Sequence, residues 1–304
     1  MNFQQLRVFV HAARCSTLTE AAEQLDLKQP TVSFHLKKLE EDLGVELFRK
    51  QLRHLQLTET GQALFPFARR IYALVGEAER LMMEYREQGR GLLKLGASYT
   101  PATYFMPPYL ADFQTQYPQV TPTLSVKKAS SILILLKEYE VDVAVVSLPL
   151  TDIEGLQLVP LVQDELKLML PPEHPLSRKE HITVSDLSKE PFLVHEHGST
   201  SRELSEAWAR DNGLRLNIRM ELGAIETIKE SVKHGIGIGI LPLRSVEKEI
   251  QRGELIMRNL PGYVNRRHIC LVFRDEEVMP YQVRTFIQFM RSRCSLPGSH
   301  VQSI

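Results

Sequence analysis

A ten-residue stretch near the N-terminus carries side chains suited to reading DNA bases. Gln, Ser, Thr and His donate to or accept from base edges in the major groove, an aromatic ring or a threonine methyl contacts the thymine methyl, and Lys reaches phosphates. The residues of these types are Gln29, Thr31, Ser33, Phe34, His35, Lys37 and Lys38. Presented together on one face of a helix, they would suit the major groove.

A second set, rich in hydroxyl groups, is spread over the C-terminal two thirds of the chain. Its members are Ser98-Tyr99-Thr100, Ser130-Ser131, Ser199-Thr200-Ser201-Arg202 and Glu226-Thr227. Hydroxyls with a single arginine suit a small anion, such as a carboxylate or a sulfur or phosphate oxyanion, better than a large apolar ligand. Glu226 leaves an alternative open, because it could pair with Arg202 or receive a ligand amine. Each of these four segments, taken alone, is equally well explained as the N-terminal cap of a helix.

The first set requires two short helices joined by a turn over residues 19–41. Small and apolar residues predict the buried side of both helices: Ala21, Ala22 and Leu25 in the first, and Val32, Leu36 and Leu39 in the second. Asp26-Leu27-Lys28 has the length of the turn, and Pro30 suits a first helical position because it has no N–H to donate. The alternative is an ordinary amphipathic helix in a helical hairpin, with a solvated polar face.

The residues on either side of this tract favour DNA binding. An amphipathic helix precedes it, and its apolar residues are Phe3, Leu6, Val8, Phe9, Val10 and Ala13. After it, Leu43-Gly44 suits a helix end. A basic stretch, residues 49–54, then returns through residues 55–57 with strand-like alternation. This pattern predicts a hairpin wing whose basic tip lies over the phosphate backbone.

The N-terminal segment resembles LysR-type transcriptional regulators through FQQLRVFVHAARCSTLTEAAEQLDLKQPTVSFHLKKLEEDLGVELFRK and the following LQLTETG. The later architecture extends the resemblance over essentially the whole chain. Lys28 replaces the family's usual Ser or Thr, and Phe34-His35 stands where Arg is often found, so the preferred operator does not carry over. The expected DNA-binding residues are Thr19, Lys28, Gln29, Pro30, Thr31, Ser33, Phe34, His35, Lys37, Lys38, Arg49, Lys50 and Arg53.

Length and composition indicate two or three domains without a membrane segment. The chain has 304 residues, of which 43% are hydrophobic, and it contains no apolar run of about 18 residues. It begins with an amphipathic helix rather than a signal peptide, so a cytoplasmic location is expected. The three cysteines, Cys15, Cys270 and Cys294, lack paired spacing, which predicts reduced side chains and no metal site.

Net charge does not by itself indicate a DNA-binding protein. Lys plus Arg and Asp plus Glu each number 37, and residues 1–90 hold 13 basic against 12 acidic side chains. A nucleic-acid binder recognised by bulk charge would be more basic. DNA binding therefore rests on the clustering of basic groups around the polar helix face. One module of near-neutral charge should bind weakly, which favours a dimer or a larger oligomer.

A long helix over residues 59–90 is predicted to dimerise the protein. Thr58 is the expected N-cap, and the following apolar residues recur in steps of four and three: Leu64, Ala68, Ile71, Val75, Ala78, Met82 and Tyr85. Packing on its own domain is the alternative. Pro66 bends the helix or marks its true start. Residues 89–91, Gly-Arg-Gly, are expected to form a hinge.

Pairing of two such helices would hold two winged modules at a fixed separation, on an inverted-repeat DNA site with half-sites about one helical turn or a multiple apart. The family resemblance implies a homotetramer that bends promoter DNA, and RNA polymerase as a further candidate partner.

The rest of the chain alternates between strands and helices, which predicts α/β order with a mostly parallel sheet. Two similar units joined by two crossings resemble the effector domain of LysR-type regulators, of periplasmic-binding-protein type. The predicted domains are a winged helix-turn-helix at 1–58, a linker helix at 59–90 and an effector-binding domain at 91–304. Subdomain I covers 91–161 and 266–304, and subdomain II covers 162–265.

In open α/β sheets, ligands bind beyond the carboxyl ends of strands, where helix N-termini present free N–H groups to an anion. The hydroxyl groups follow this rule, and they match positions where family members commonly contact an effector. The resemblance thus implies the effector-binding residues Ser98, Tyr99, Thr100, Thr103, Ser130, Ser131, Ser147, Ser199, Thr200, Ser201, Arg202, Glu226 and Thr227.

Catalysis is not expected. Gly235-Ile236-Gly237-Ile238-Gly239 lacks the spacing of a nucleotide-binding loop and is interpreted as a buried strand. No nucleophile-base-acid set or metal constellation is found in the sequence, and no cofactor is predicted. A soluble receptor serving a transporter would share the sensor fold but would have a secretion signal and no winged module. The chain is therefore interpreted as a transcriptional regulator that responds to a small, anionic metabolite.

Overall fold

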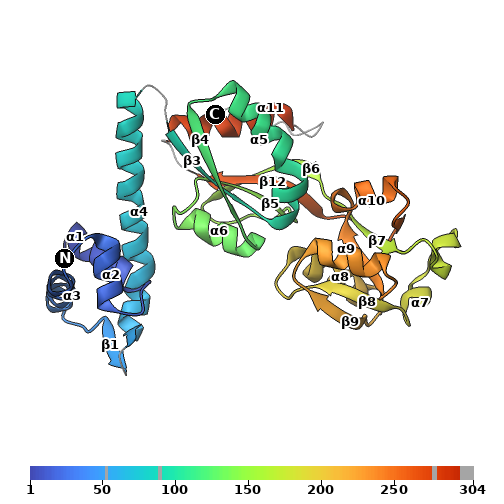
Figure 1. The fold of residues 1–304 in the computed structure, drawn as a ribbon, viewed down its shortest axis with the longest axis horizontal. Coiled ribbons are helices and arrows are strands. Elements are labelled where there is room, and N and C mark those ends of the chain that lie inside the picture. The colour runs from blue at the N-terminus through green and yellow to red at the C-terminus, as the bar shows by residue number, and fades with distance from the viewer. Residues whose placement is uncertain (52–53, 88–90, 276–278, 295–304) are drawn as a thin grey trace. The chain divides into compact units, whose positions relative to one another are not determined.

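The computed structural model describes residues 1–51, 54–87, 91–275 and 279–294 (Figure 1). It forms two compact units. The N-terminal unit runs over residues 1–88, and the C-terminal unit comprises most of residues 89–304.

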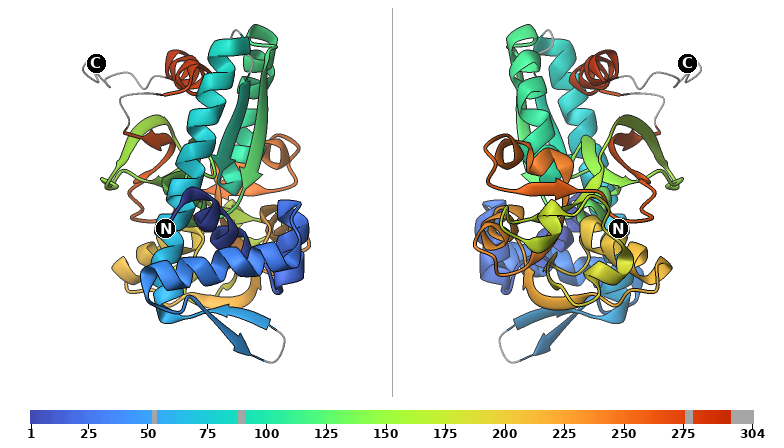
Figure 2. Two further views of the ribbon diagram at one scale, coloured as in Figure 1. Left: turned by 90° about the vertical axis from the view of Figure 1, so that its left-hand side faces the viewer. Right: turned by 90° about the vertical axis from the view of Figure 1, so that its right-hand side faces the viewer.

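Three helices and a hairpin build the start of the N-terminal unit. They are α1 (Phe3–Ala12), α2 (Leu18–Leu25), α3 (Gln29–Leu43), β1 (Phe48–Gln51) and β2 (His54–Leu57). The turn between α2 and α3 begins at Asp26, which has a left-handed backbone with φ 54°. Gly44 ends α3 at φ 70°, where glycine carries no steric cost. The hairpin projects away from the helices as predicted for a wing (Figure 2).

The core of this unit confirms the predicted inner sides of α2 and α3. All six predicted residues are buried: Ala21, Ala22, Leu25, Val32, Leu36 and Leu39. Small side chains at Ala21 and Ala22 let α2 lie close to its neighbours. Phe9 of α1 is fully buried among them and contacts the ring of Phe48 edge-on.

Helix α4 (Glu59–Glu87) is one long element, and it begins where Thr58 caps it, with the Thr58 hydroxyl accepting a hydrogen bond from the N–H of Gly61 at 3.0 Å. The start is therefore at Glu59. Pro66 lies inside the helix and does not mark its beginning. Pro66 has no N–H for the carbonyl four residues earlier. Because Pro66 lies on the exposed side of the helix, water can donate to that carbonyl instead.

The predicted apolar seam of α4 divides in two. Leu64 and Ala68 pack into the core of the N-terminal unit, as the alternative interpretation had it. The remaining predicted positions from Ile71 to Met82 are exposed or half-buried, and the side chain of Tyr85 lies outside the described residues. The correction arises because α1 covers the first turns of α4, so a self-contained core takes up those residues. An exposed apolar stripe nevertheless remains, formed by Phe67, Ile71, Leu74, Ala78 and Met82.

Subdomain I of the C-terminal unit is a five-stranded sheet in the order β4-β3-β5-β12-β6. Its strands are β3 (Gly91–Ala97), β4 (Val120–Val126), β5 (Val143–Pro149), β6 (Leu156–Gln163) and β12 (Arg267–Arg274). Helices α5 (Met106–Gln116) and α11 (Tyr281–Arg293) cover one face, and α6 (Ala129–Lys137) covers the other (Figure 1). Strands β3, β4 and β5 are parallel, and β12 is antiparallel to both β5 and β6.

Two features of subdomain I differ from the sequence prediction. The sequence pattern does not predict strand β6, because its residues span the predicted boundary between the subdomains at residues 161 and 162. The sequence pattern over residues 102–117 predicts a single helix, but the structure divides this stretch into a π-helical turn, η1 (Pro101–Phe105), and α5. Pro107 and Pro108 at the start of α5 supply no N–H groups, which favours a change of hydrogen-bond pattern at this point.

Subdomain II has a second five-stranded sheet in the order β11-β7-β10-β8-β9. Its strands are β7 (Leu166–Leu170), β8 (Pro191–His195), β9 (Asn217–Leu222), β10 (Ile238–Pro242) and β11 (Ile256–Arg258). Its helices are η2 (Pro175–Arg178), α7 (Val184–Leu187), α8 (Thr200–Asp211), α9 (Ile225–Lys233), η3 (Leu243–Ser245) and α10 (Glu247–Gln251). The chain passes between the subdomains after β6 and again before β12.

The glycine-rich run lies at the start of β10, as predicted for a buried strand. A Cβ atom at Gly237 would stand 2.5 Å from the carbonyl oxygen of Pro191, so the close approach of β8 requires glycine there. The run therefore serves sheet packing.

Candidate functional site

Helix α3 presents the predicted DNA-reading side chains to solvent. The exposed ones are Gln29, Pro30, Thr31, Ser33, Phe34, Lys37 and Lys38, and His35 is half-buried. Phe34 is unusual for an aromatic residue, because 64% of its surface is exposed. The opposite side of the helix is buried in the core, so the polar side is free to enter a groove.

The other expected DNA-binding residues lie on neighbouring elements. Thr19 is exposed on α2, Lys28 is exposed as the N-cap residue of α3, and Arg49 is exposed on β1. Lys50 belongs to β1, but its side chain lies outside the described residues, as does Arg53 altogether. The structure thus gathers the described members of this set on α2, α3 and the wing of one unit.

The lysines of α3 are partly compensated by acidic residues near the end of the helix. Lys38 lies 3.6 Å from Glu41 and 3.6 Å from Asp42, and Lys37 lies 3.9 Å from Glu41. All four are solvent-exposed, and such pairs are weak and screened by salt. Both lysines can therefore exchange these partners for phosphates.

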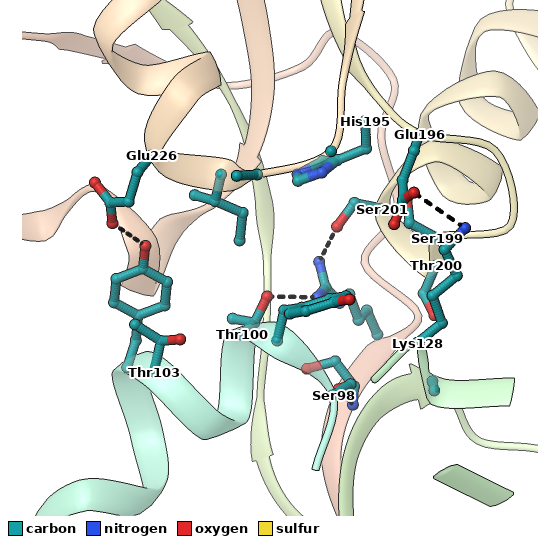
Figure 3. Close-up of a pocket in the computed structure, with 18 residues that line it drawn as sticks. Ser98, Thr100, Thr103, Lys128, His195, Glu196, Ser199, Thr200, Ser201 and Glu226 are labelled. Atoms are coloured by element: carbon teal, nitrogen blue, oxygen red, sulfur yellow. Dashed lines mark hydrogen bonds and ion pairs between the residues drawn. The ribbon is translucent and has the colours of Figure 1, made fainter. Parts of the chain in front are cut away.

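A cavity of about 210 Å³ lies between subdomains I and II (Figure 3). It collects nine of the predicted effector-binding residues: Ser98, Tyr99, Thr100, Thr103, Ser147, Ser199, Thr200, Ser201 and Glu226. They come from the carboxyl ends of β3 and β5 and from the starts of η1, α8 and α9. The rule that ligands bind beyond the carboxyl ends of strands therefore located most of this cavity from the sequence.

Four predicted effector residues do not line the cavity. Ser130, Ser131 and Thr227 lie on α6 and α9, outside the lining. Arg202 is buried, and its guanidinium points away: Nε lies 2.6 Å from Glu206, and Nη1 donates to the carbonyl oxygen of His195 at 3.3 Å. The i,i+4 position of Glu206 on the same helix explains this orientation. Arg202 is therefore not the cation that faces a ligand.

Arg267, which begins β12, takes the place that the sequence assigned to Arg202. It lines the cavity with only 2% of its surface exposed. Its Nη1 donates to the hydroxyl of Ser201 at 3.0 Å, and its Nη2 donates to the hydroxyl of Thr100 at 3.3 Å. One guanidinium thus links subdomain I to the start of α8 in subdomain II.

The charge of Arg267 is balanced by Asp164. The Nε atom lies 3.1 Å from Asp164 Oδ2, and the aspartate is fully buried. Ser147 donates to the same carboxylate oxygen at 2.8 Å, and the backbone N–H of Ser147 donates to the hydroxyl of Ser98 at 3.0 Å. Burial lowers the pKa of Arg267, and Asp164 opposes that shift.

This network leaves several hydroxyl groups as donors toward the cavity. The oxygens of Thr100 and Ser201 accept from Arg267, and the oxygen of Ser98 accepts from a backbone N–H. A hydroxyl that accepts in this way retains its own O–H for donation, and hydrogen bonds in a chain polarise one another. The first residues of α8 add backbone N–H groups that no helical carbonyl serves. The cavity therefore offers donors to an oxygen-rich ligand.

His195 ends β8 and adds a neutral imidazole to the same region (Figure 3). Only 7% of its surface is exposed, and its Nε2 atom has no hydrogen-bond partner among the described residues. Burial, with Arg267 and Arg202 nearby, lowers the pKa of His195 to about 4. The ring is thus uncharged near neutral pH, and the hydrogen-bonding capacity of its Nε2 atom is unused among the described residues.

Two contacts join the subdomains on either side of this region. Tyr104 of η1 donates a hydrogen bond to Glu226 of α9. Glu226 also pairs with Lys229 at 2.9 Å, and the buried Lys229 ammonium lies 2.8 Å from Glu249. Lys128 donates to the carbonyl oxygen of His197 at 2.6 Å.

The second contact carries charge as well as a hydrogen bond. Lys128, which comes just before α6, lies 3.3 Å from Glu196, which follows β8. Among the lining residues that the structure describes, every charged group therefore has an opposite charge within reach. The neutral hydroxyl and N–H donors are therefore the groups that remain for a charged ligand.

Sequence reasoning missed several lining residues, among them Tyr104, Lys128, His195, Glu196 and Arg267. His195 and Glu196 lie at the carboxyl end of β8, so the same rule that found Ser98 could have found them. Arg267 begins a strand instead of following one. No local signal marks it.

Neither a metal-binding cluster nor a membrane-spanning helix occurs among the described residues. Over residues 1–51, 54–87, 91–275 and 279–294, no group of three or more His, Cys, Asp or Glu side chains could hold a metal ion. No helix within those ranges is long and apolar enough to span a membrane.

Comparison with known proteins places both units. Residues 3–62 match the family model of the bacterial regulatory helix-turn-helix protein, lysR family, and residues 86–295 match that of the LysR substrate binding domain. The RuBisCO operon transcriptional regulator of Allochromatium vinosum is 28% identical over 295 residues, which is 97% of each chain.

Two solved structures are similar. A full-length OxyR variant from Pseudomonas aeruginosa aligns with a TM-score of 0.73 at 23% identity and covers 100% of this chain and 99% of its own. The regulatory domain of Synechocystis CcmR, solved in complex with 2-PG, aligns with a TM-score of 0.62 at 25% identity. That alignment covers 67% of this chain and 97% of the CcmR domain.

We predict that Asp164→Ala lowers the free energy of unfolding of the C-terminal unit by about 3–5 kcal/mol, because it leaves the buried Arg267 cation uncompensated. Urea titration followed by the fluorescence of Trp208 measures this, since Trp208 is the one tryptophan of the chain and is buried in subdomain II. Asp152→Ala, at an exposed carboxylate, is the matched control. Equal losses in both variants would contradict the assigned role of the ion pair.

Proposed function

This chain belongs to the LysR family of transcriptional regulators, and we propose that a small anion bound in its cavity controls how it binds and bends promoter DNA. One observation carries the proposal: a buried arginine holds the hydroxyls of Thr100 and Ser201 as donors toward the cavity. In this proposal the helix-turn-helix binds DNA, and the cavity binds the anion that regulates DNA binding.

An anion suits the donors better than a cation does. The hydroxyls and the N–H groups at the start of α8 all place partial positive charge toward the same space, and the dipole of α8 adds to it. His195 Nε2 adds an uncharged polar atom that has no hydrogen-bond partner among the described residues. A cation would find no unpaired carboxylate among the described lining residues, because Glu196 and Glu226 already pair with Lys128 and Lys229.

The pairing of Glu226 also bears on the alternative that it receives a ligand amine. Burial by itself would raise the pKa of Glu226, but the hydrogen bonds from Tyr104 and Lys229 lower that pKa overall. An amine would have to displace both partners. The solved complex of the CcmR regulatory domain with 2-PG supports a small-molecule effector in this type of domain.

The expected response is a change in the closure of the two subdomains. Thr100 and Thr103 precede or belong to η1, and the same short turn carries Tyr104, which contacts α9 across the cavity. A ligand that binds the hydroxyls while α8 faces it from the other side favours a more closed arrangement. In a two-state protein, the shift can be no larger than the difference in the ligand's affinity for the two states. DNA bending would follow from the changed geometry of the paired subunits.

We predict that Thr100→Val abolishes most of the anion response while DNA binding without anion persists. The effector is first chosen as the small carboxylate or phosphate ester that raises the melting temperature of the wild-type protein most. Loss of a charge-assisted donor should weaken its binding by about tenfold or more. Titration calorimetry measures the affinity, and gel-shift titration of a promoter fragment measures DNA binding.

Ser130→Ala is the matched control, because it removes an exposed hydroxyl that lies outside the cavity. It should bind the anion as the wild-type protein does. A Thr100→Val protein that retains wild-type anion affinity, or that loses DNA binding and anion binding together, would count against the proposal.

We further propose that the protein acts as a homodimer that pairs again into a homotetramer on inverted-repeat DNA. Two separate kinds of surface are needed for such an assembly. One is the exposed apolar stripe of α4 from Phe67 to Met82. Another is offered by the open edge strands β4 and β9, which expose Leu124, Val126, Ile218 and Met220.

We predict that Ile71→Glu combined with Leu74→Glu raises the dimer dissociation constant by about 100-fold or more, since two copies would bury four new charges. Sedimentation equilibrium measures the association. Gln62→Glu serves as the control, because it adds a charge of the same sign to an exposed position of α4 away from the stripe. An unchanged dissociation constant in the double variant would remove α4 from the interface.

A further inference from the structure

An exposed phenylalanine stands at the middle of the outward face of α3. Phe34 is 64% exposed, whereas Val32, Leu36 and Leu39 are buried on the opposite side. At 100° per residue, Phe34 points almost directly away from the centre of that buried side. It therefore lies near the centre of the face that α3 presents to whatever covers the helix.

The ring of Phe34 contacts the neighbouring residue on α3. The imidazole of His35 meets it edge-on, with ring centroids 5.7 Å apart. The next turn of the helix carries Lys37 and Lys38, both exposed. The ring thus sits among polar and cationic groups, with most of its surface exposed to solvent.

The basic surroundings indicate what covers Phe34. Lys37, Lys38 and Arg49 of the same unit are exposed and favour a polyanion over an apolar protein surface. A phenyl ring can neither donate nor accept a conventional hydrogen bond, so it gains no phosphate contact. In the major groove, the apolar feature that a base offers is the C5-methyl group of thymine.

We propose that Phe34 is a specificity-determining residue that contacts the C5-methyl group of one thymine in each half-site of the operator. Burial of that methyl group against the ring gives the preference for thymine. The inference depends on α3 entering the major groove and is independent of the proposed effector.

Uracil in place of thymine removes the methyl group and leaves every hydrogen-bonding group unchanged. Duplexes are first selected from a random pool with the full-length wild-type protein. Each thymine of the selected duplex is then replaced by uracil, one position at a time. At one position in each half-site, uracil should weaken wild-type binding by about fourfold, the value of burying one such carbon group.

Phe34→Ala should reduce this loss to less than about twofold at the same position, while Phe34→Leu, which keeps an apolar side chain, should retain part of it. Lys37→Ala is the matched control: it should weaken binding to all duplexes and preserve the roughly fourfold loss on uracil substitution. The helical circular dichroism of each variant is recorded, and the exposed position of Phe34 predicts no change.

Two results would overturn the proposal. One is a wild-type protein that binds every uracil duplex as tightly as its thymine parent. The other is a Phe34→Ala protein that shows the same loss as the wild-type protein at the sensitive position. Failure of the wild-type protein to select any sequence would instead count against base reading by α3, and would overturn the inference with it.

Discussion

The buried ion pair between Arg267 and Asp164 is the interaction on which the C-terminal unit depends. Asp164 lies in the first passage between the subdomains and Arg267 at the end of the second, and the backbone N–H of Asp164 also donates to the carbonyl oxygen of Arg267 at 3.1 Å. The pair therefore joins the two connections at their base. Because both ions are buried, removal of either leaves an uncompensated charge, so the pair can only be kept or replaced as a whole.

The same ion pair determines how the cavity presents charge. Asp164 neutralises Arg267, and the remaining hydrogen-bonding capacity of the guanidinium goes to the hydroxyls of Thr100 and Ser201. A ligand therefore meets oriented O–H and N–H dipoles, with the cation one step behind them. Such a site recognises where the oxygens of a ligand lie as well as its charge, because each donor atom has a fixed position. His195 also presents an uncharged group to the cavity, because its imidazole is neutral.

Local sequence patterns predicted the sides of α3 and most of the cavity lining. The inner and outer sides of α3 followed from residue spacing, and Ser98, Thr100 and Ser201 followed from their places after strands and at the start of a helix. Arg267 could not be found in this way, because its importance comes from partners far away in the sequence. Arg202 was misplaced because Glu206, one turn along α8, competes for its guanidinium. The apolar seam of α4 was read correctly as apolar, but spacing alone does not tell which residues a neighbouring helix covers.

The central claim is that an anion is received by hydroxyls which Arg267 orients. A crystal structure of the protein with the small anion that most raises its melting temperature tests it directly. The account predicts oxygen atoms of that anion within hydrogen-bonding distance of the hydroxyls of Thr100 and Ser201 and of His195 Nε2, with the Arg267–Asp164 pair intact. An anion bound outside this cavity, or one that draws Arg267 away from Asp164 into a direct ion pair, would contradict it.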